Sequence, residues 1–207
     1  MNNNGVCFII GAGEPTIAPL KINKNDYMIA VDGGFSVLEQ AGIEADIVVG
    51  DFDSYGKTPT HHLILKAPAE KDDTDMMMAI KHGLEKGYRV FHIFGGTGGR
   101  FDHSVANLQL LTYLARRNAQ GFLYAQSNII TAITNTTMHF DSTYKGYISV
   151  LAADSKVEGV TLTGLKYPLT NATITNEFPI GVSNEFLGVE SSVCIANGSA
   201  FIIIEKD

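Results

Sequence analysis

The segment Ile47-Val-Val-Gly-Asp-Phe-Asp-Ser54 joins an apolar run to a pair of carboxylates. The run Ile47–Val49 is typical of a strand that is buried on both faces. Asp51 and Asp53 follow it two residues apart, so their side chains point the same way if the chain stays extended. This segment predicts a buried strand with two acidic side chains at its carboxyl end.

The regions on either side of this segment alternate between strand and helix patterns. Further apolar runs of strand length lie at residues 6–10, 27–31, 89–94 and 121–125. Apolar residues recur at helical spacing over residues 35–41, 76–85 and 102–115. Such alternation predicts a parallel sheet with helices on its faces, and ligands of these sheets bind beyond the carboxyl ends of the strands.

Two of the expected helices have recognisable starts. Asp73-Thr74 offers an N-cap for the helix over residues 76–85. Its inward face would carry Met76, Ala79, Ile80, Gly83 and Leu84. The helix after residue 101 would begin at Asp102 or His103. Its inward face is predicted to hold Val105, Leu108, Thr112 and Ala115.

After about residue 128 the pattern changes to short β-rich runs separated by prolines and glycines. Asn197-Gly198 lies between two apolar runs, which is a signal for a hairpin. We therefore expect an α/β class protein: an N-terminal parallel-sheet α/β domain at residues 1–128, followed by a C-terminal antiparallel β-sandwich domain at residues 129–207.

Composition narrows the class of protein. A length of 207 residues suits two small domains, and a formal charge of −7 argues against nucleic-acid binding. Cys7 and Cys194 lie far apart in apolar runs, as expected in a reducing compartment. No signal-peptide pattern and no apolar run near the ~20 residues of a membrane span are present. We expect a cytoplasmic protein that binds neither nucleic acid nor membrane.

Clustered acidic residues suggest a metal ion. Asp51 and Asp53 repel each other unless a cation lies between them, and Mg²⁺ is held by one or two carboxylates with substrate phosphates completing its shell. The segment Lys71-Asp-Asp-Thr-Asp75 repeats the motif. A turn and a helix cap would also account for these residues.

A glycine loop, Gly95-Gly-Thr-Gly-Gly99, lies between an expected strand and an expected helix. Backbone N–H groups at such a place favour a phosphate, and Arg100 is a suitable phosphate clamp. The loop is neither a P-loop nor the dinucleotide fingerprint. Gly11-Ala-Gly13 also lacks the third glycine of that fingerprint, and we interpret it as a plain strand-to-loop turn.

These motifs together resemble the thiamine pyrophosphokinase family. The resemblance is carried by residues 32–34, 50–54, 71–75, 98–110, 164–169 and 181–185, in the order expected along nearly the whole chain. It implies an α/β catalytic domain, a β-sandwich domain that helps bind thiamine, and a homodimer with active sites between subunits. It also implies transfer of diphosphate from ATP to the hydroxyl of thiamine, with release of AMP.

The resemblance and the motifs give a set of candidate site residues. Mg²⁺ would be held, directly or through water, by Asp51, Asp53, Asp72 and Asp75, which with Arg100 form the catalytic set. ATP would be bound by Asp32, Lys71, Gly96, Gly98, Gly99, Arg100, Asp102 and His103. Thiamine would be bound by Asp102, Ser183 and Asn184.

Two other classes of function stay open from the sequence. A metal-dependent phosphatase could use Asp51 as nucleophile. Tyr55 argues against it, because such phosphatases usually have Thr or Val at that position. A non-catalytic sensor of nucleotide or thiamine diphosphate would bind its ligand without consuming ATP.

Overall fold

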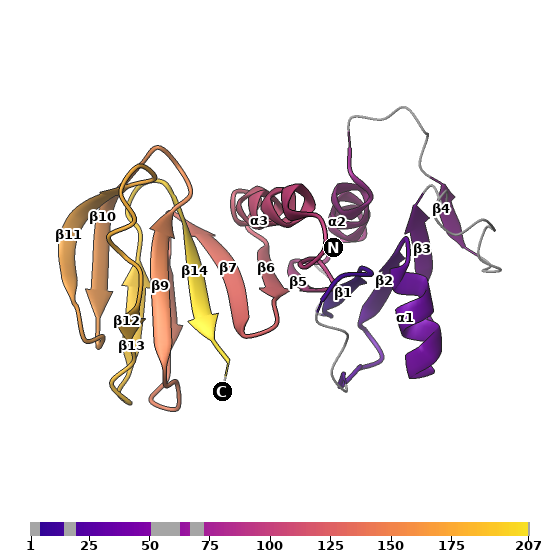
Figure 1. The fold of residues 1–207 in the computed structure, drawn as a ribbon, viewed down its shortest axis with the longest axis horizontal. Helices are drawn as coiled ribbons and strands as arrows, with labels where there is room; N and C mark the ends of the chain where they lie inside the picture. Colours follow the sequence, from indigo (N-terminus) through magenta and orange to yellow (C-terminus); the bar gives the residue numbers. More distant parts are fainter. Residues whose placement is uncertain (1–4, 15–19, 51–62, 67–72, 207) are drawn as a thin grey trace. The chain divides into compact units, whose positions relative to one another are not determined.

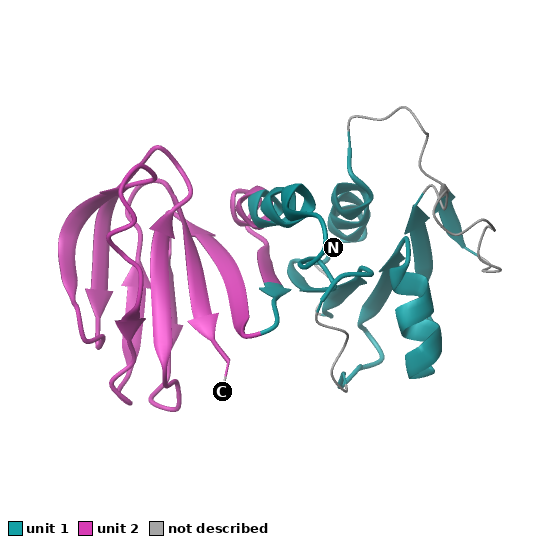
Figure 2. Cartoon of the chain, in the orientation of Figure 1, with its two compact units in different colours: residues 1–110, 123–126 teal, residues 111–122, 127–207 magenta. Residues whose placement is uncertain are grey.

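The computed structural model describes residues 5–14, 20–50, 63–66 and 73–206 (Figure 1). The chain divides into two compact units, coloured separately in Figure 2. The first unit comprises residues 1–110 and 123–126, and the second comprises residues 111–122 and 127–207. The predicted domain boundary after residue 128 stays a prediction.

The first unit is built on a parallel sheet. Its strands are β1 (Cys7–Ile10), β2 (Tyr27–Val31), β3 (Ile47–Gly50), β4 (Ile64–Lys66) and β5 (Val90–Phe94). Their order is β4-β3-β2-β1-β5, and each neighbouring pair is parallel. All residues of β1 and β3 are buried, as expected of strands covered on both faces.

Helices cover both faces of this sheet (Figure 1). Helix α1 (Gly34–Ala41) packs Leu38 against a cluster that includes Phe8 and Ile10 of β1. Helix α2 (Asp75–Glu85) lies on the opposite face, where Gly83 approaches Cys7. The buried residues of α2 are Met76, Ala79, Ile80 and Gly83, which are four of the five residues predicted on its inward face. The fifth, Leu84, is only partly buried.

Helix α3 (Phe101–Ala115) begins one or two residues earlier than the predicted start at Asp102 or His103, and its predicted inward face is wrong. Val105 is 39% exposed, whereas the buried residues are Asn107, Leu110, Leu111 and Leu114. The helix carries apolar residues on two stripes. The stripe with three leucines is the one that is buried, because it removes more apolar surface from water.

The second unit is an antiparallel sandwich. Its strands are β7 (Asn128–Thr134), β8 (Thr137–Phe140), β9 (Tyr147–Ala152), β10 (Lys156–Thr163), β11 (Leu169–Thr175), β12 (Asn184–Glu185), β13 (Ser191–Cys194) and β14 (Ser199–Glu205). One sheet has the order β12-β9-β14-β7 and the other β11-β10-β13-β8. Strand β6 (Gln120–Tyr124) and helix α3 contribute residues to both units.

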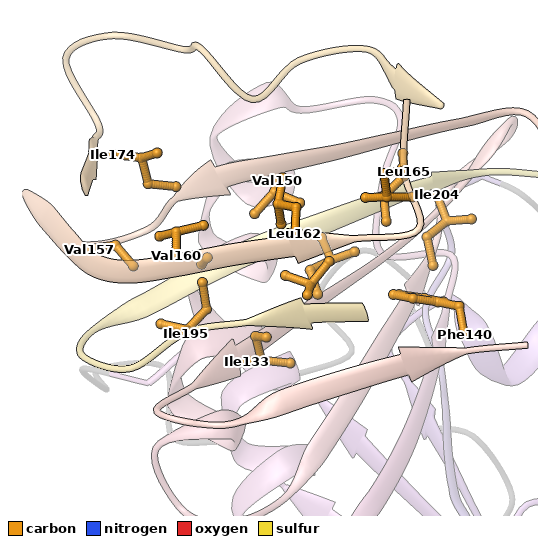
Figure 3. Close-up of a cluster of buried hydrophobic side chains, with 14 of the residues drawn as sticks. Ile133, Phe140, Val150, Val157, Val160, Leu162, Leu165, Ile174, Ile195 and Ile204 are labelled. Carbon is orange, nitrogen blue, oxygen red and sulfur yellow. The ribbon is translucent and has the colours of Figure 1, made fainter. Parts of the chain in front are cut away.

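Side chains from both sheets meet in the core of the sandwich (Figure 3). Val150 and Ile204 come from one sheet, and Val160 and Leu162 from the other. This packing confirms the predicted fold class, an α/β unit followed by a β-sandwich. Within the described part of the chain, no helix combines the length and the apolar character that a membrane span requires.

The hairpin predicted at Asn197-Gly198 is wrong. These residues join β13 to β14, which belong to different sheets. The reason is a competing partner: the backbone of Asn197 exchanges two hydrogen bonds with the backbone of Glu158, at 2.9 and 3.1 Å. The turn therefore closes one end of the sandwich instead of pairing the strands that flank it.

Candidate active site

A cavity of about 300 Å³ lies at the carboxyl ends of the strands of the first unit. The loops after β1, β2 and β5 and the starts of α2 and α3 supply its walls. The lining residues are Gly11, Ala12, Gly13, Val31, Asp32, Thr74, Asp75, Met76, Gly95, Gly96, Thr97, Gly98, Arg100, His103, Ala106 and Asn107. The cavity lies where ligands of parallel sheets bind.

Two backbone loops form one wall of the cavity. The N–H groups of Gly11, Gly13 and Glu14 donate to the carbonyls of Phe94, Gly95 and Thr97, at 2.8, 2.9 and 2.7 Å. Gly95 has a φ of 63°, and a Cβ there would lie 2.2 Å from the carbonyl oxygen of Gly11. Glycine is therefore required for this close approach. The segment interpreted as a plain turn is part of the cavity wall.

Asp32 lies at the end of β2 with its carboxylate against the next strand. Its φ of 47° is unusual for a residue other than glycine, and its N–H donates to the carbonyl of Val49 at 2.9 Å. A Cβ at position 50 would lie only 2.1 Å from Asp32 Oδ1. Gly50 thus leaves room for the carboxylate directly beside the strand end that precedes Asp51.

Of the described residues in the acidic run, Asp75 is the one whose carboxylate lines the cavity. It lies in the first turn of α2, where the helix dipole favours an anion. Thr74 precedes it and accepts a hydrogen bond from the N–H of Met77 at 3.2 Å. Asp73 instead pairs with Lys81, with 2.6 Å between Oδ2 and Nζ.

Arg100 and Asp102 form a two-pronged ion pair at the start of α3. Nε and Nη2 of Arg100 donate to Oδ1 and Oδ2 of Asp102 at 3.1 and 2.5 Å. This hydrogen bonding lowers the pKa of Asp102 and raises the pKa of Arg100. Arg100 lines the cavity, as does His103, so the carboxylate of Asp102 orients a guanidinium at the cavity wall.

The remaining predicted residues fall into three groups. Asp51, Asp53, Lys71 and Asp72 lie outside the described residues. Ser183 and Asn184 belong to the second unit. Ser183 is exposed with a φ of 58°, whereas Asn184 is buried and bonds both the N–H and the carbonyl of Tyr167, at 2.9 and 2.7 Å. Gly99 is the last residue of the glycine loop; it has a φ of 64° and is not among the residues that line the cavity.

Sequence reasoning missed several residues that line the cavity. Gly11 and Gly13 lacked a full fingerprint, and Thr97 was seen only as part of the glycine loop. Asn107 carried a signal that could have been used, because an asparagine among the buried leucines of α3 needs a hydrogen-bond partner.

The cavity contains side chains of the type that binds Mg²⁺, the predicted cation. Asp32 and Asp75 both line it, and carboxylate oxygen is the ligand type that Mg²⁺ prefers. Among the residues that the structure describes, no three His, Cys, Asp or Glu side chains group as a metal site. Three of the four predicted ligands, Asp51, Asp53 and Asp72, lie outside these residues.

Two family models match the chain in the order of its halves. Residues 18–123 match the catalytic domain of thiamin pyrophosphokinase, and residues 135–202 match the vitamin B1 binding domain of thiamin pyrophosphokinase. A thiamine pyrophosphokinase of Bacillus subtilis is 34% identical, covering 96% of this chain and 98% of its own. The chain belongs to the thiamine pyrophosphokinase family, which confirms the resemblance found in its motifs.

Solved structures agree with this assignment. The thiamine pyrophosphokinase structure from Bacillus subtilis has a TM-score of 0.87 and 30% identity, covering 99% of this chain and 100% of that one. The structure from Geobacillus thermodenitrificans has a TM-score of 0.82 and 29% identity, covering 98% of each chain. The similarity therefore extends over both units of the fold.

Proposed function

We propose that this chain catalyses the Mg²⁺-dependent transfer of diphosphate from ATP to the hydroxyl of thiamine, giving thiamine diphosphate and AMP. The observation that carries the proposal is the 34% identity to a thiamine pyrophosphokinase over nearly the full length of both chains. The cavity of the first unit, with its glycine loops, arginine and carboxylates, supports it. The comparisons support neither the phosphatase nor the sensor alternative.

The loops and Arg100 would bind the phosphates of ATP. Catalysis of phosphoryl transfer depends mainly on positioning and on stabilising charge. The thiamine hydroxyl attacks the β-phosphorus, and charge develops on the departing AMP. Backbone N–H groups of Gly96 and Gly98, together with the guanidinium that Asp102 orients, would stabilise it. Asp32, Lys71, Gly99 and His103 complete the proposed nucleotide site.

Asp75 would bind Mg²⁺ from the start of α2, with Asp51, Asp53 and Asp72 as the other proposed ligands. When bound, the ion would neutralise phosphate oxygens and orient them for in-line attack. Asp32 would add negative charge at the strand end next to Gly50. Carboxylates held near one another repel, and a bound cation would offset that repulsion.

Thiamine would be bound with help from the second unit and from Asp102. Ser183 and Asn184 follow the resemblance in this role, and the buried bonds of Asn184 to Tyr167 would hold that segment in place. Thiamine is a cation, so an acidic site also suits the acceptor. We further propose a catalytic domain at residues 1–128, a thiamine-binding domain at 129–207, a homodimer and a cytoplasmic location.

Product identification tests the reaction. Purified protein is incubated with ATP, Mg²⁺ and thiamine, and the products are separated and weighed by mass spectrometry. We expect thiamine diphosphate and AMP in equal amounts. Free phosphate without thiamine, together with a trappable aspartyl-phosphate, would indicate the phosphatase. Binding of ligand by calorimetry without consumption of ATP would indicate the sensor.

A further inference from the structure

We infer that Asn107 is a positioning residue for the nucleotide: its side-chain amide ties the glycine loop at Gly96 to helix α3 and so sets where the loop lies in the cavity wall. The inference rests on the proposed function and extends it to a residue to which no role was given. Asn107 is only 8% exposed, and its Nδ2 donates to the carbonyl of Gly96 at 2.7 Å.

This hydrogen bond completes a series along the loop. The carbonyls of Phe94, Gly95 and Thr97 accept hydrogen bonds from N–H groups of the loop after β1, which are those of Gly11, Gly13 and Glu14. The carbonyl of Gly96 is the one in between, and Asn107 of α3 is its donor. Four successive carbonyls are thus held by partners within the protein.

Held carbonyls determine where the N–H groups point. In a trans peptide the C=O of one residue and the N–H of the next point in opposite directions. The held carbonyl of Gly95 therefore fixes the N–H of Gly96. The peptide between Gly96 and Thr97 is held by Asn107 on one side and by the antiparallel bridge of Thr97 with Glu14 on the other, which keeps the loop in place. Gly96 and Thr97 line the cavity, as does Asn107 itself. Phosphate oxygens would meet donors that are already oriented, which reduces the cost of ordering them.

A merely structural asparagine would behave differently. Loss of a buried hydrogen bond lowers stability wherever it occurs. Loss of a positioning bond also weakens binding of the nucleotide, while KM for thiamine stays nearly the same. The test therefore compares Asn107 variants with a variant that removes a partly buried hydrogen bond elsewhere in the same unit.

The variants are chosen to match. Asn107→Asp keeps the shape of the side chain but replaces the N–H donor with an oxygen, and Asn107→Leu is a second variant without charge. Tyr124→Phe is the control, since it removes the hydroxyl that lies 2.7 Å from Nδ1 of His92 and retains the ring. Each protein is assayed for thermal stability, KM for ATP, KM for thiamine, and calorimetric affinity for Mg²⁺ with α,β-methylene-ATP, which cannot be cleaved between its α- and β-phosphates.

We expect both Asn107 variants to lose affinity for the nucleotide analogue and to raise KM for ATP, each about tenfold. KM for thiamine should change by less than about twofold, and Tyr124→Phe should lose stability without these changes. Equal loss of affinity in the control, no loss in the Asn107 variants, or failure of both to fold would overturn the inference. Failure of the proposed function is distinguishable, because the wild type would then bind the analogue without making thiamine diphosphate.

Discussion

At the scale of single residues, the acidic run at the start of α2 separates into carboxylates with different surroundings. Asp75 lines the cavity, whereas Asp73 precedes the helix and pairs with Lys81 of α2. The sequence showed only that there were more acidic residues than a cap requires. Their division depends on where the helix starts, because one residue of shift turns a side chain by about 100°.

Asp75→Asn tests the role of the cavity carboxylate. We expect kcat to fall at least about 100-fold, because a group that stabilises charge in the transition state is lost. The unfolding free energy should change by less than about 1 kcal/mol, the size of a helix-dipole effect. Steady-state kinetics and urea titration measure the two quantities. Asp73→Asn is the matched control, and a similar loss of kcat in that protein would contradict the assignment.

Arg100→Lys tests the phosphate clamp. Lysine keeps the charge but cannot make the two-pronged bond to Asp102, so its position at the cavity wall is no longer fixed. We expect KM for ATP to rise about tenfold with little change in stability. Arg117→Lys, at the other end of the same helix, should leave KM unchanged. An unaltered KM in Arg100→Lys would remove this residue from the nucleotide site.

At the scale of elements, periodicity located the helices well but did not always decide which face is buried. In α2 a single apolar stripe left no choice. In α3 two stripes competed, and the leucines at 110, 111 and 114 were buried in place of Val105. The hairpin prediction at Asn197-Gly198 was wrong for a similar reason. Asn197 pairs with Glu158, which lies far away in the sequence and cannot be identified from a local pattern. Local signals are reliable where no second partner competes.

Thr74→Ala tests how far the start of α2 depends on its cap. The hydroxyl of Thr74 accepts from the N–H of Met77, and losing it leaves a helix N–H without that acceptor. We expect the unfolding free energy to fall by about 1 kcal/mol. Thr74→Ser should restore most of this loss in a urea titration. If Thr74→Ala had the same unfolding free energy as the wild type, the cap would not stabilise the helix.

At the scale of the molecule, the order of motifs predicted the two-part fold and its family. The residues that form the cavity wall, by contrast, could be identified only from the structure. The contact of Gly11 and Gly13 with the glycine loop joins segments about eighty residues apart, as the bond from Thr97 Oγ1 to the carbonyl of Glu14 illustrates. Such pairing follows from the strand order, in which β1 lies beside β5. The spacing of residues along the chain does not reveal which strands lie side by side in the sheet.

Stability should depend on pH through two partly buried histidines. Burial lowers the pKa of His92 and of His82 below their ordinary value of 6.5. The folded protein then binds fewer protons than the unfolded chain, so this contribution to stability is present above pH 6.5 and is lost as the pH falls from there toward the folded pKa values. Urea titrations at about pH 7 and about pH 5 should show this decrease. His92→Gln should make it smaller, and an unchanged decrease would exclude His92 as its source.

The central claim is that carboxylates at the carboxyl ends of the parallel strands hold a magnesium–nucleotide complex. A crystal structure with Mg²⁺, α,β-methylene-ATP and thiamine tests it most directly. We predict phosphates against the loop at Gly95–Gly99 and Mg²⁺ at roughly 2.1 Å from a carboxylate oxygen of Asp75 or of its proposed co-ligands. A nucleotide bound elsewhere, with Asp51, Asp53, Asp72 and Asp75 far from any shared ion, would contradict the account.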